Sequence, residues 1–332
     1  MACDSCFAAR LRYQVRFEGE ENERMLPILA EHFRMLQQPV QQIGNRLTVP
    51  EEAMAELFDF CNEHMNLAAI FYRIENGEWE PLRNIPSVLE SQWIDDVIKL
   101  ERITPFFQPI VDAQEQIFGH EILSRSFRDD GTLIPPIELF SSARKRNRLY
   151  ALDKLCRLTA VKQAPKLGNQ KMFINFLPTS IYSPEHCLKT TLEMSRKTGA
   201  NPAHFVFEVV ESEKVDDLEH LKAILRFYRE HGFEYALDDV GEGYSTLDVL
   251  RELKPAYMKL DRKYVHGIAT DPLKQRMANK IIQVAREIQS IPLAEGIEDR
   301  RDFECVRGMG YQLFQGYHFG KPAEQPVQSL HA

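Results

Sequence analysis

No apolar run in the sequence approaches the roughly 18 residues that a membrane-spanning helix needs, so we expect no membrane span. The first residues, MACDSCFAARLRYQVRF, lack the basic segment followed by an apolar segment that marks a secretory signal, which predicts a cytoplasmic protein with reduced thiols. Positive charge is in deficit, because 41 Lys and Arg against 49 Asp and Glu give a formal net charge of −8. This deficit argues against binding of polymeric nucleic acid, but it is compatible with a small anionic ligand held through metal ions.

The chain is long enough for a large catalytic domain and a small accessory one, and its 44% hydrophobic and 27% charged residues are ordinary for a soluble globular protein. We expect a small α+β regulatory or sensor module over residues 1–85, because its early stretch RLRYQVRF alternates apolar and polar residues as a half-buried strand does. Ser87 and Glu90 have capping-box spacing, which predicts a connecting helix over 86–103. The second domain would then span 104–332.

From residue 105 onward, short apolar segments alternate with helical stretches such as LDKLCRLTAVKQA and HLKAILRFYREHG. Eight of the apolar segments are typical of strands: FFQPIVD, GHEILSRSF, KMFINFLP, HFVFEVVE, EYALDDVG, AYMKLD, IPLAEGIE and YQLFQGYHF. This order predicts an α/β fold, a barrel of the TIM type with eight strands and surrounding helices. Catalytic residues of such barrels gather at the C-terminal rim, and branched apolar residues fill the interior below it.

Polar residues interrupt or end several of these otherwise apolar strands. They are Glu121, Asn175, Glu208, Asp238, Asp239, Lys259 and Glu295. Desolvation would strongly disfavour a lone carboxylate there, and several converging carboxylates would repel one another unless divalent ions neutralised them. Carboxylate and amide oxygens suit Mg²⁺ or Mn²⁺, and no matching set of histidines favours zinc at this place.

Each acidic residue taken alone has a structural alternative. An Asp or Glu at a strand end is often a helix cap or a surface salt-bridge partner. The recurrence of such residues on successive strands, in the same relation to the apolar run, favours a shared functional site instead.

The chain from about 104 to 324 resembles the EAL domain, the cyclic di-GMP phosphodiesterase module of bacterial signalling. The resemblance rests on motifs that follow one another in the family's order: FFQPIVD, GHEILSR, INFLP, FEVVES, DDVGEGYSTL, MKLD, AEGIE and LFQGYHFGKP. It implies a modified eight-stranded barrel that opens cyclic di-GMP to linear pGpG with two Mg²⁺ or Mn²⁺ ions. It also implies a homodimer.

The resemblance further implies roles for individual residues. The metal ligands would be Glu121, Asn175, Glu208, Asp238, Asp239 and Glu295. The catalytic residues would be Glu121, Lys259 and Glu295, with Lys259 orienting the attacking water or steadying the developing charge. The residues that bind the dinucleotide would be Gln108, Leu123, Arg125 and Gln315. Glu211 and Glu298 would support the loop after the paired aspartates.

Three positions depart from the family's pattern. Ile122 replaces the signature alanine in an apolar slot, which leaves the neighbouring carboxylate intact. Val240 and Glu242 replace the usual phenylalanine and threonine of the loop, and Glu242 adds a negative charge that would change metal affinity or regulation.

Three functions are therefore open. The first is an active phosphodiesterase, and the second is a catalytically weak or inactive cyclic di-GMP receptor or protein-interaction module. The third is an unrelated barrel phosphodiesterase, which substrate selectivity would distinguish.

The N-terminal region also carries thiols at metal-ligand spacing. Cys3 and Cys6 form a CxxC pair, and Cys61 and His64 lie three residues apart on a predicted helix. Together they predict a structural zinc site if the N-terminus packs beside that helix. The alternative is that Cys61, which has apolar neighbours, is an ordinary buried thiol.

Overall fold

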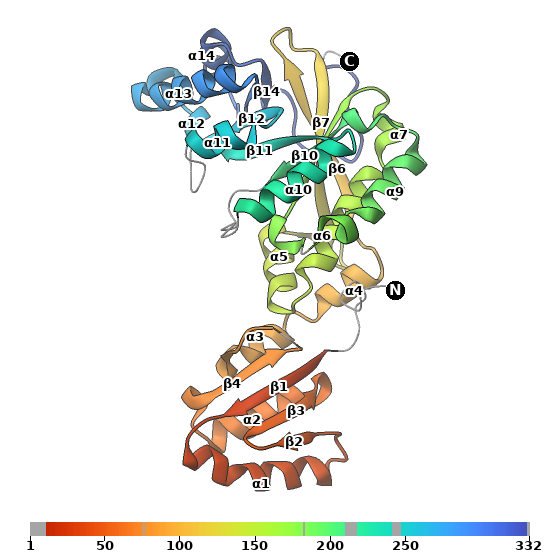
Figure 1. Cartoon of the computed structure of the whole chain (residues 1–332), viewed down its shortest axis with the longest axis vertical. Helices are drawn as coiled ribbons and strands as arrows, with labels where there is room; N and C mark the ends of the chain where they lie inside the picture. The colour runs from red at the N-terminus through yellow and green to blue at the C-terminus, as the bar shows by residue number, and fades with distance from the viewer. Residues whose placement is uncertain (1–10, 76, 182, 210–217, 241–246, 331–332) are drawn as a thin grey trace. The chain divides into compact units, whose positions relative to one another are not determined.

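The computed structural model describes residues 11–75, 77–181, 183–209, 218–240 and 247–330, with the backbone alone for residues 239, 240, 247 and 248. The chain divides into two compact units (Figure 1). The first contains Met1–Arg102 and Ser126–Leu152, and the second contains Ile103–Arg125 and Asp153–Ala332. No helix among the described residues is long and apolar enough to cross a membrane.

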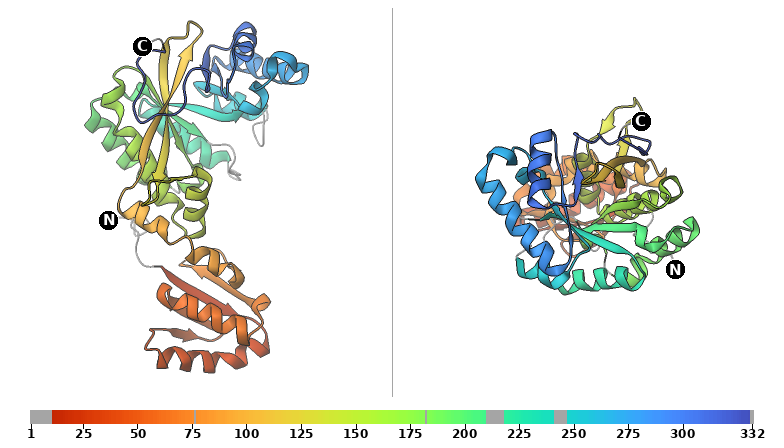
Figure 2. Two further views of the ribbon diagram at one scale, coloured as in Figure 1. Left: turned by 180° about the vertical axis from the view of Figure 1, so that it is seen from behind. Right: turned by 90° about the horizontal axis from the view of Figure 1, so that it is seen from above.

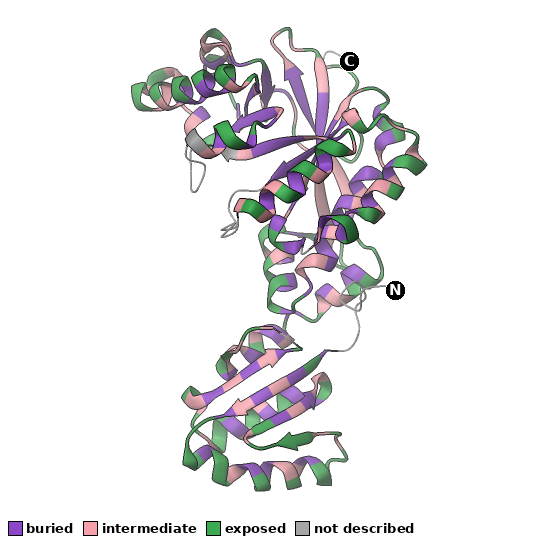
Figure 3. Ribbon diagram, in the orientation of Figure 1, coloured by how far each residue is buried: buried purple, intermediate pink, exposed green. Residues whose placement is uncertain are grey.

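The first unit is built on an antiparallel sheet in the order β2-β3-β1-β4-β5. Its strands are β1 (Arg12–Phe17), β2 (Gln41–Ile43), β3 (Arg46–Pro50), β4 (Ile70–Ile74) and β5 (Glu80–Pro81). Its other elements are α1 (Glu20–Met35), η2 (Glu51–Ala53), α2 (Met54–His64), η3 (Leu67–Ala69), η4 (Leu82–Asn84), α3 (Ile85–Leu89), α4 (Trp93–Lys99), β8 (Leu133–Ile134), α5 (Pro136–Lys145) and the start of α6 (Leu149–Val161). Alternate residues of β1 are buried, as its sequence predicts, and they pack with apolar residues of α1 and α2 into one core (Figure 3).

The predicted connecting helix over 86–103 is wrong as a single element, because α3 ends at Leu89 and α4 begins at Trp93. Ser87, expected as the cap, lies inside α3. The hydroxyl of Ser91 donates to the carbonyl of Ser87, and the Ser91 amide turns to the carbonyl of Val88 instead. A serine that bonds back to the preceding turn competes with the helical pattern and favours a break at this place.

The second unit is a closed barrel of eight strands, as the sequence predicts. The strands are β6 (Thr104–Asp112), β7 (Ile117–Phe127), β9 (Lys171–Phe176), β10 (Phe205–Val209), β11 (Glu234–Val240), β12 (Tyr257–Leu260), β13 (Ile291–Ala294) and β14 (Leu313–Gln315). They follow one another in the order β6-β14-β13-β12-β11-β10-β9-β7, and pairing of β7 with β6 closes the ring.

Helices lie outside this ring of strands (Figure 2). They are the rest of α6, α7 (Ala164–Leu167), α8 (Pro184–Cys187), α9 (Lys189–Thr198), α10 (Leu218–Glu230), α11 (Leu247–Leu253), α12 (Arg262–Val265), α13 (Pro272–Ile288) and α14 (Arg300–Met309), with the short η5 (Pro178–Ser180), η6 (Pro202–His204) and η7 (Ile268–Thr270). Asp271 and Asp299 begin two of them, α13 and α14, by accepting hydrogen bonds from first-turn amides.

One strand runs against the others. β6 is antiparallel to both of its neighbours, β14 and β7, whereas the remaining pairs in the ring are parallel. The barrel is thus a modified form of the all-parallel TIM arrangement.

An apolar layer crosses the barrel interior. Its buried residues come from seven strands: Ile110, Phe173, Val206, Ala236, Tyr257, Leu293 and Leu313. On the eighth strand, β7, the corresponding position is Gly119, where a Cβ atom would lie 2.4 Å from the Lys171 carbonyl oxygen. This layer forms the floor on which the candidate site is built.

Candidate functional site

A polar layer lies directly above the apolar floor. On each strand the polar residue stands two positions from the floor residue, so that both side chains point to the same face of the strand. These residues are Gln108, Glu121, Asn175, Glu208, Asp238, Lys259, Glu295 and Gln315. The predicted metal-binding and catalytic residues whose side chains the structure describes therefore all come from one layer of the barrel.

The ammonium group of Lys259 lies at the centre of this layer. Its Nζ is 2.9 Å from Glu208 Oε1, 3.1 Å from Asp238 Oδ1, 3.2 Å from Glu295 Oε2 and 4.0 Å from Glu121 Oε2. Lys259 and Glu208 are 1% and 0% exposed, so water does not screen these charges. Four carboxylates thus face a single cation.

Burial and mutual repulsion shift the charges of this cluster. Burial raises the pKa of Glu208 well above its ordinary value, and the nearby carboxylates add to the rise that Lys259 opposes. The pKa of Glu295 is also well raised, by burial first and then by Asp238. Burial alone would lower the pKa of Lys259, but the carboxylates, Asp238 and Glu121 first, raise it well above its usual range. Lys259 is therefore a permanent positive charge at neutral pH.

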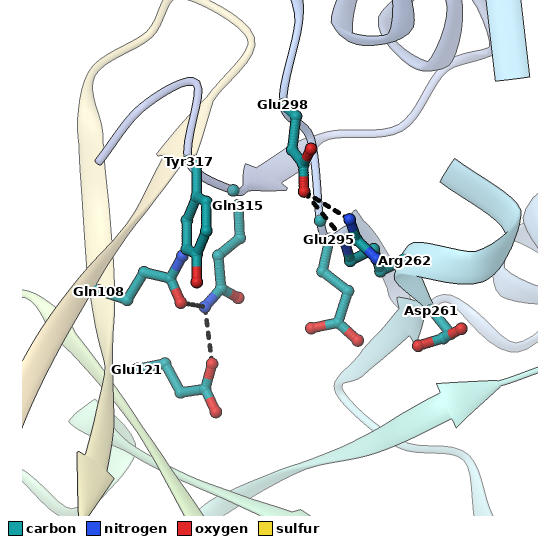
Figure 4. A pocket seen from close by; sticks show the side chains of 10 residues that line it. Gln108, Glu121, Asp261, Arg262, Glu295, Glu298, Gln315 and Tyr317 are labelled. Carbon is teal, nitrogen blue, oxygen red and sulfur yellow. Dashed lines mark hydrogen bonds and ion pairs between the residues drawn. The ribbon is translucent and has the colours of Figure 1, made fainter. Parts of the chain in front are cut away.

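Glu121 is held by amide groups on both of its oxygens. Asn175 Nδ2 donates to Oε1 at 2.7 Å, and Gln315 Nε2 donates to Oε2 at 2.6 Å. Gln315 Nε2 also lies 3.2 Å from Gln108 Oε1, and Figure 4 shows Gln315 between Gln108 and Glu121. These contacts connect β6, β7, β9 and β14 and fix the direction of the Glu121 carboxylate.

A pocket of about 400 Å³ opens beside this cluster. It is lined by Gln108, Glu121, Asp261, Arg262, Glu295, Gly296, Glu298, Gln315, Gly316 and Tyr317 (Figure 4). Gly296 has a φ of +69°, and a Cβ atom there would lie 2.2 Å from Cγ of Arg262. Only glycine allows Arg262 to lie against this wall of the pocket.

Three lining residues with side chains, besides Gly296 and Gly316, were not predicted from the sequence: Asp261, Arg262 and Tyr317. Asp261 ends the MKLD motif and Arg262 follows it, and Tyr317, which is 57% exposed, lies within LFQGYHF. Their place just beyond the carboxyl ends of β12 and β14 was the available signal, because residues at that end of a barrel strand face the rim.

Other predicted site residues lie at the edge of this arrangement. Glu298 lines the pocket, and its Oε1 accepts hydrogen bonds from Arg262 Nε at 3.0 Å and Nη2 at 2.7 Å, which lowers the pKa of Glu298. Leu123 and Arg125 lie farther along β7, and both are half-buried. Burial lowers the pKa of Arg125, against the opposing charge of Glu121. Neither of the two is among the described residues that line the pocket.

The donor atoms of the polar layer fit divalent cations. Both carboxylate oxygens of Glu208 and Oδ1 of Asp238 are buried and accept no hydrogen bond, although Lys259 lies close to each side chain. Burial and then the mutual repulsion of four carboxyl groups around one ammonium group raise the pKa values of Glu208 and Glu295, and hard cations such as Mg²⁺ or Mn²⁺ would favour the ionised forms. Within the described ranges, no three acidic, histidine or cysteine side chains already form a coordinating set, since Lys259 lies between the carboxylates.

Several predicted residues lie outside what the structure describes. Of Asp239 and Val240 only the backbone is described, at the end of β11. Glu211 and Glu242 lie outside the described residues, as do Cys3 and Cys6.

The other half of the predicted zinc site gives no support to it. Cys61 is fully buried in the core of the first unit, and burial raises the pKa of its thiol to about 12. His64 is exposed on the same helix. Since zinc binds the thiolate, this environment disfavours Cys61 as a ligand, and the zinc site stays a prediction.

The sequence and the fold of this chain are similar to those of known proteins. A sequence model of the EAL domain matches residues 91–322. The probable cyclic di-GMP phosphodiesterase PdeG of Escherichia coli K12 is 30% identical over 229 residues, which make up 66% of this chain and 44% of PdeG. This chain thus spans less than half the length of that relative.

Solved structures share the fold. The cyclic di-GMP-bound crystal structure of a standalone EAL protein from Vibrio cholerae O395 is 35% identical and has a TM-score of 0.60, covering 67% of this chain and 93% of that one. The manganese and cyclic di-GMP complex of Klebsiella pneumoniae BlrP1 is 20% identical with a TM-score of 0.60, and it covers 94% of this chain and 96% of that one. At 20% identity the second likeness concerns the fold alone.

Proposed function

The chain belongs to the EAL-domain family, and on that basis we propose that its barrel hydrolyses cyclic di-GMP to linear pGpG with the help of divalent metal ions. The observation that carries the proposal is the polar layer, in which Lys259 and four carboxylates converge at one end of the barrel beside a pocket. The named relatives and solved structures are compatible with this substrate, since PdeG is a probable cyclic di-GMP phosphodiesterase and the Vibrio protein binds cyclic di-GMP.

The metal ions would be Mg²⁺ or Mn²⁺, two in number. Their ligands would come from the polar layer and from the residue after it on β11: Glu121, Asn175, Glu208, Asp238, Asp239 and Glu295. When bound, such ions polarise the scissile phosphodiester and lower the pKa of an attacking water.

The protein's own groups would orient the reaction. Asn175 and Gln315 hold both oxygens of Glu121, so the carboxylate keeps one direction before substrate arrives. Lys259 carries a fixed positive charge that draws Glu208, Asp238 and Glu295 together and stabilises negative charge that develops on the phosphate. Against the effect of burial, the carboxylates raise the pKa of Lys259, which favours its charged form, so Lys259 would act as a cation and hydrogen-bond donor.

The remaining parts of the proposal concern the whole chain. Residues 1–85 would be a regulatory module joined to the enzyme domain of 104–332, and the chain would act as a homodimer in the bacterial cytoplasm. The dinucleotide would contact Gln108, Leu123, Arg125 and Gln315, while Glu211 and Glu298 would support the loop after β11.

The test is hydrolysis of cyclic di-GMP by the purified full chain in Mn²⁺ and, separately, in Mg²⁺, with chromatography for pGpG. Glu121→Gln keeps the shape of the side chain and removes its charge, so we expect turnover to fall by at least about 100-fold. Glu115→Gln is the matched control, because Glu115 lies in the turn between β6 and β7 and pairs with Arg300, away from the pocket.

Absence of product from the unaltered chain in both metals would overturn the enzyme proposal. Calorimetric titration of the same sample with cyclic di-GMP would then separate the alternatives. Binding without turnover would mean a receptor, and no binding would leave a protein-interaction module.

A further inference from the structure

A second buried charged group, the ion pair of Asp153 and Arg157 on α6, lies outside the polar layer. Asp153 is 2% exposed and accepts hydrogen bonds at both of its oxygens. Its Oδ1 accepts from the Leu177 amide at 2.9 Å, and its Oδ2 accepts from Arg157 Nη1 at 3.0 Å. The Ser180 hydroxyl lies 3.0 Å from Oδ2 and 2.7 Å from the Leu177 carbonyl oxygen, either of which accepts its one proton. The carboxylate therefore contacts the chain at Leu177, just before η5, and at Ser180, the last residue of η5.

The ion pair with Arg157 has no access to water. Arg157 is 0% exposed, and its Nε donates to Thr191 Oγ1 of α9 at 3.1 Å. Desolvation of two such charges is costly, and an apolar pair of similar volume is often as stable or more stable. Stability alone therefore does not account for a charged pair at this position.

The segment that Asp153 holds leads directly from a proposed metal ligand. Leu177 follows the last residue of β9 and stands two residues after Asn175, a distance of about 7 Å along an extended strand. Asn175 in turn donates to Glu121 at 2.7 Å and pairs in register with Glu208 of β10. A shift of the end of β9 would thus move three residues of the polar layer.

We propose that Asp153 is a positioning residue for the metal site: it fixes the end of β9 so that Asn175 and Glu121 keep the direction needed to bind the ions. The proposal rests on the proposed function for the identity of the ions. It assigns to Asp153 no contact with substrate or metal, since it acts through the Leu177 amide and Ser180.

The central variant is Asp153→Leu combined with Arg157→Met. The double change replaces the ion pair by apolar side chains and removes the acceptor for Leu177 without leaving a buried charge unpaired. A milder variant, Ser180→Ala, removes a single hydrogen-bond donor and tests the same connection where the double variant fails to fold.

The matched control is Glu234→Gln. Glu234 of β11 pairs with Lys171 Nζ at 2.5 Å, and Lys171 is the first residue of β9, so this ion pair holds the opposite end of the same strand. If Asp153 only stabilised the fold, the variants at Asp153 and Ser180 and the variant at Glu234 would change Mn²⁺ affinity equally.

The readouts are Mn²⁺ affinity measured by electron paramagnetic resonance in the absence of substrate, turnover of cyclic di-GMP, and hydrogen exchange of the Leu177 amide in metal-free protein. We expect the double variant to weaken Mn²⁺ binding by about 10- to 100-fold and to speed Leu177 exchange, with a smaller change in the same direction for Ser180→Ala. We expect Glu234→Gln to leave Mn²⁺ affinity within about 2-fold of the unaltered chain.

Unchanged Mn²⁺ affinity in a folded double variant, or an equal loss in Glu234→Gln, would overturn the positioning role. If the unaltered chain neither binds Mn²⁺ nor hydrolyses cyclic di-GMP, the proposed function fails instead. Hydrogen exchange of the Leu177 amide then tests by itself whether Asp153 fixes the end of β9. Faster exchange in the variants supports this role, and an unchanged exchange rate overturns it.

Discussion

Gly316, the residue after Gln315, has no room for a side chain. A Cβ atom there would lie 2.0 Å from the carbonyl oxygen and 2.3 Å from the amide nitrogen of Ile297, and φ is +156°. Because both contacts are with backbone, Gly316→Ala must displace Gln315 from Glu121. We expect the free energy of unfolding to fall by about 1–3 kcal/mol and turnover to fall with it.

Chemical denaturation and a cyclic di-GMP assay check this expectation. Gly308→Ala is the control, since a Cβ atom at Gly308 of α14 meets no atom within 4 Å and alanine favours a helix by up to about 1 kcal/mol. If Gly316→Ala left both stability and turnover unchanged, the backbone around Gly316 and Ile297 would be able to shift and make room for the methyl group.

His120, which precedes Glu121 on β7, predicts a pH dependence of stability. The imidazole is 0% exposed, and burial lowers its pKa to about 4, against the smaller opposing effects of Gln170 and the Val327 backbone. Since the unfolded chain binds this proton from about pH 6.5 downward and the folded chain does not, stability is fully present above pH 6.5. It is lost as the pH falls toward 4, by about 3 kcal/mol from this group.

The imidazole titration can be followed directly by nuclear magnetic resonance, with an expected midpoint well below 6.5. The second readout is the free energy of unfolding in urea, measured at pH 6.5 and at pH 4.5. In His120→Leu, the loss of stability between these two pH values should be smaller, because the contribution of His120 is absent. A midpoint near 6.5 would rule out the buried neutral state.

The sequence predicted six residues of the polar layer because they interrupt or end apolar strands, a pattern that one chain can display, whereas Gln108 and Gln315 were expected only from the resemblance to the EAL domain. It did not predict Arg262 or Tyr317 as lining residues, since both are exposed and follow strand ends where no periodicity applies. The close approach at Gly296 likewise depends on a neighbour from another strand, which spacing along the chain does not specify.

At the scale of elements, the eight barrel strands were predicted but the direction of β6 was not. An apolar run such as FFQPIVD has the same pattern in either direction, and only its pairing with β7 and β14 determines which way it runs. The break between α3 and α4 was missed for a similar reason, because local hydrogen bonds, among them one from the Ser91 side chain, accompany it and no periodic pattern marks them.

Arg146, after α5, joins three other elements of the first unit. It is 0% exposed, its Nη1 lies 2.6 Å from Glu51 Oε1 of η2 and 3.4 Å from the Val88 carbonyl oxygen of α3, and its Nη2 pairs with Asp95 of α4. Arg146→Met would leave both carboxylates short of a partner. We expect it to lower the free energy of unfolding of this unit by about 3 kcal/mol.

Tryptophan fluorescence reports on this unit selectively, because the chain has two tryptophans and both, Trp79 and Trp93, lie within it. Lys145→Met is the control, as Lys145 is exposed at the end of α5 and a surface change there alters stability by less than about 0.5 kcal/mol. Equal denaturation midpoints for the two variants would contradict a central role for Arg146.

At the scale of the whole molecule, the crowding of four carboxyl groups around Lys259 would connect stability to the proposed metal ions. Glu208 is fully buried and neither of its oxygens accepts a hydrogen bond, while Lys259 keeps three other carboxylates if Glu208 is neutralised. We therefore expect Glu208→Gln to be more stable than the unaltered chain in a metal chelator, by on the order of 1–2 kcal/mol.

Excess Mn²⁺ should reverse this order. A ligand at 100 times its dissociation constant stabilises the folded state by about 2.7 kcal/mol, and we expect the unaltered chain to gain this and Glu208→Gln to gain less. Thermal unfolding with chelator and with Mn²⁺ measures both effects, and Glu304→Gln on the surface of α14 should respond as the unaltered chain does. Equal gains for all three would mean that Mn²⁺ binds elsewhere.

The apolar floor of the barrel has a consequence for the order of events during turnover. The layer from Ile110 to Leu313 fills the interior beneath Lys259, and the described pocket opens beside the polar layer. On the proposed function, cyclic substrate and linear product would share this pocket, and a new substrate molecule would wait until the product has left. Product release can therefore limit the rate, and accumulated pGpG should inhibit competitively.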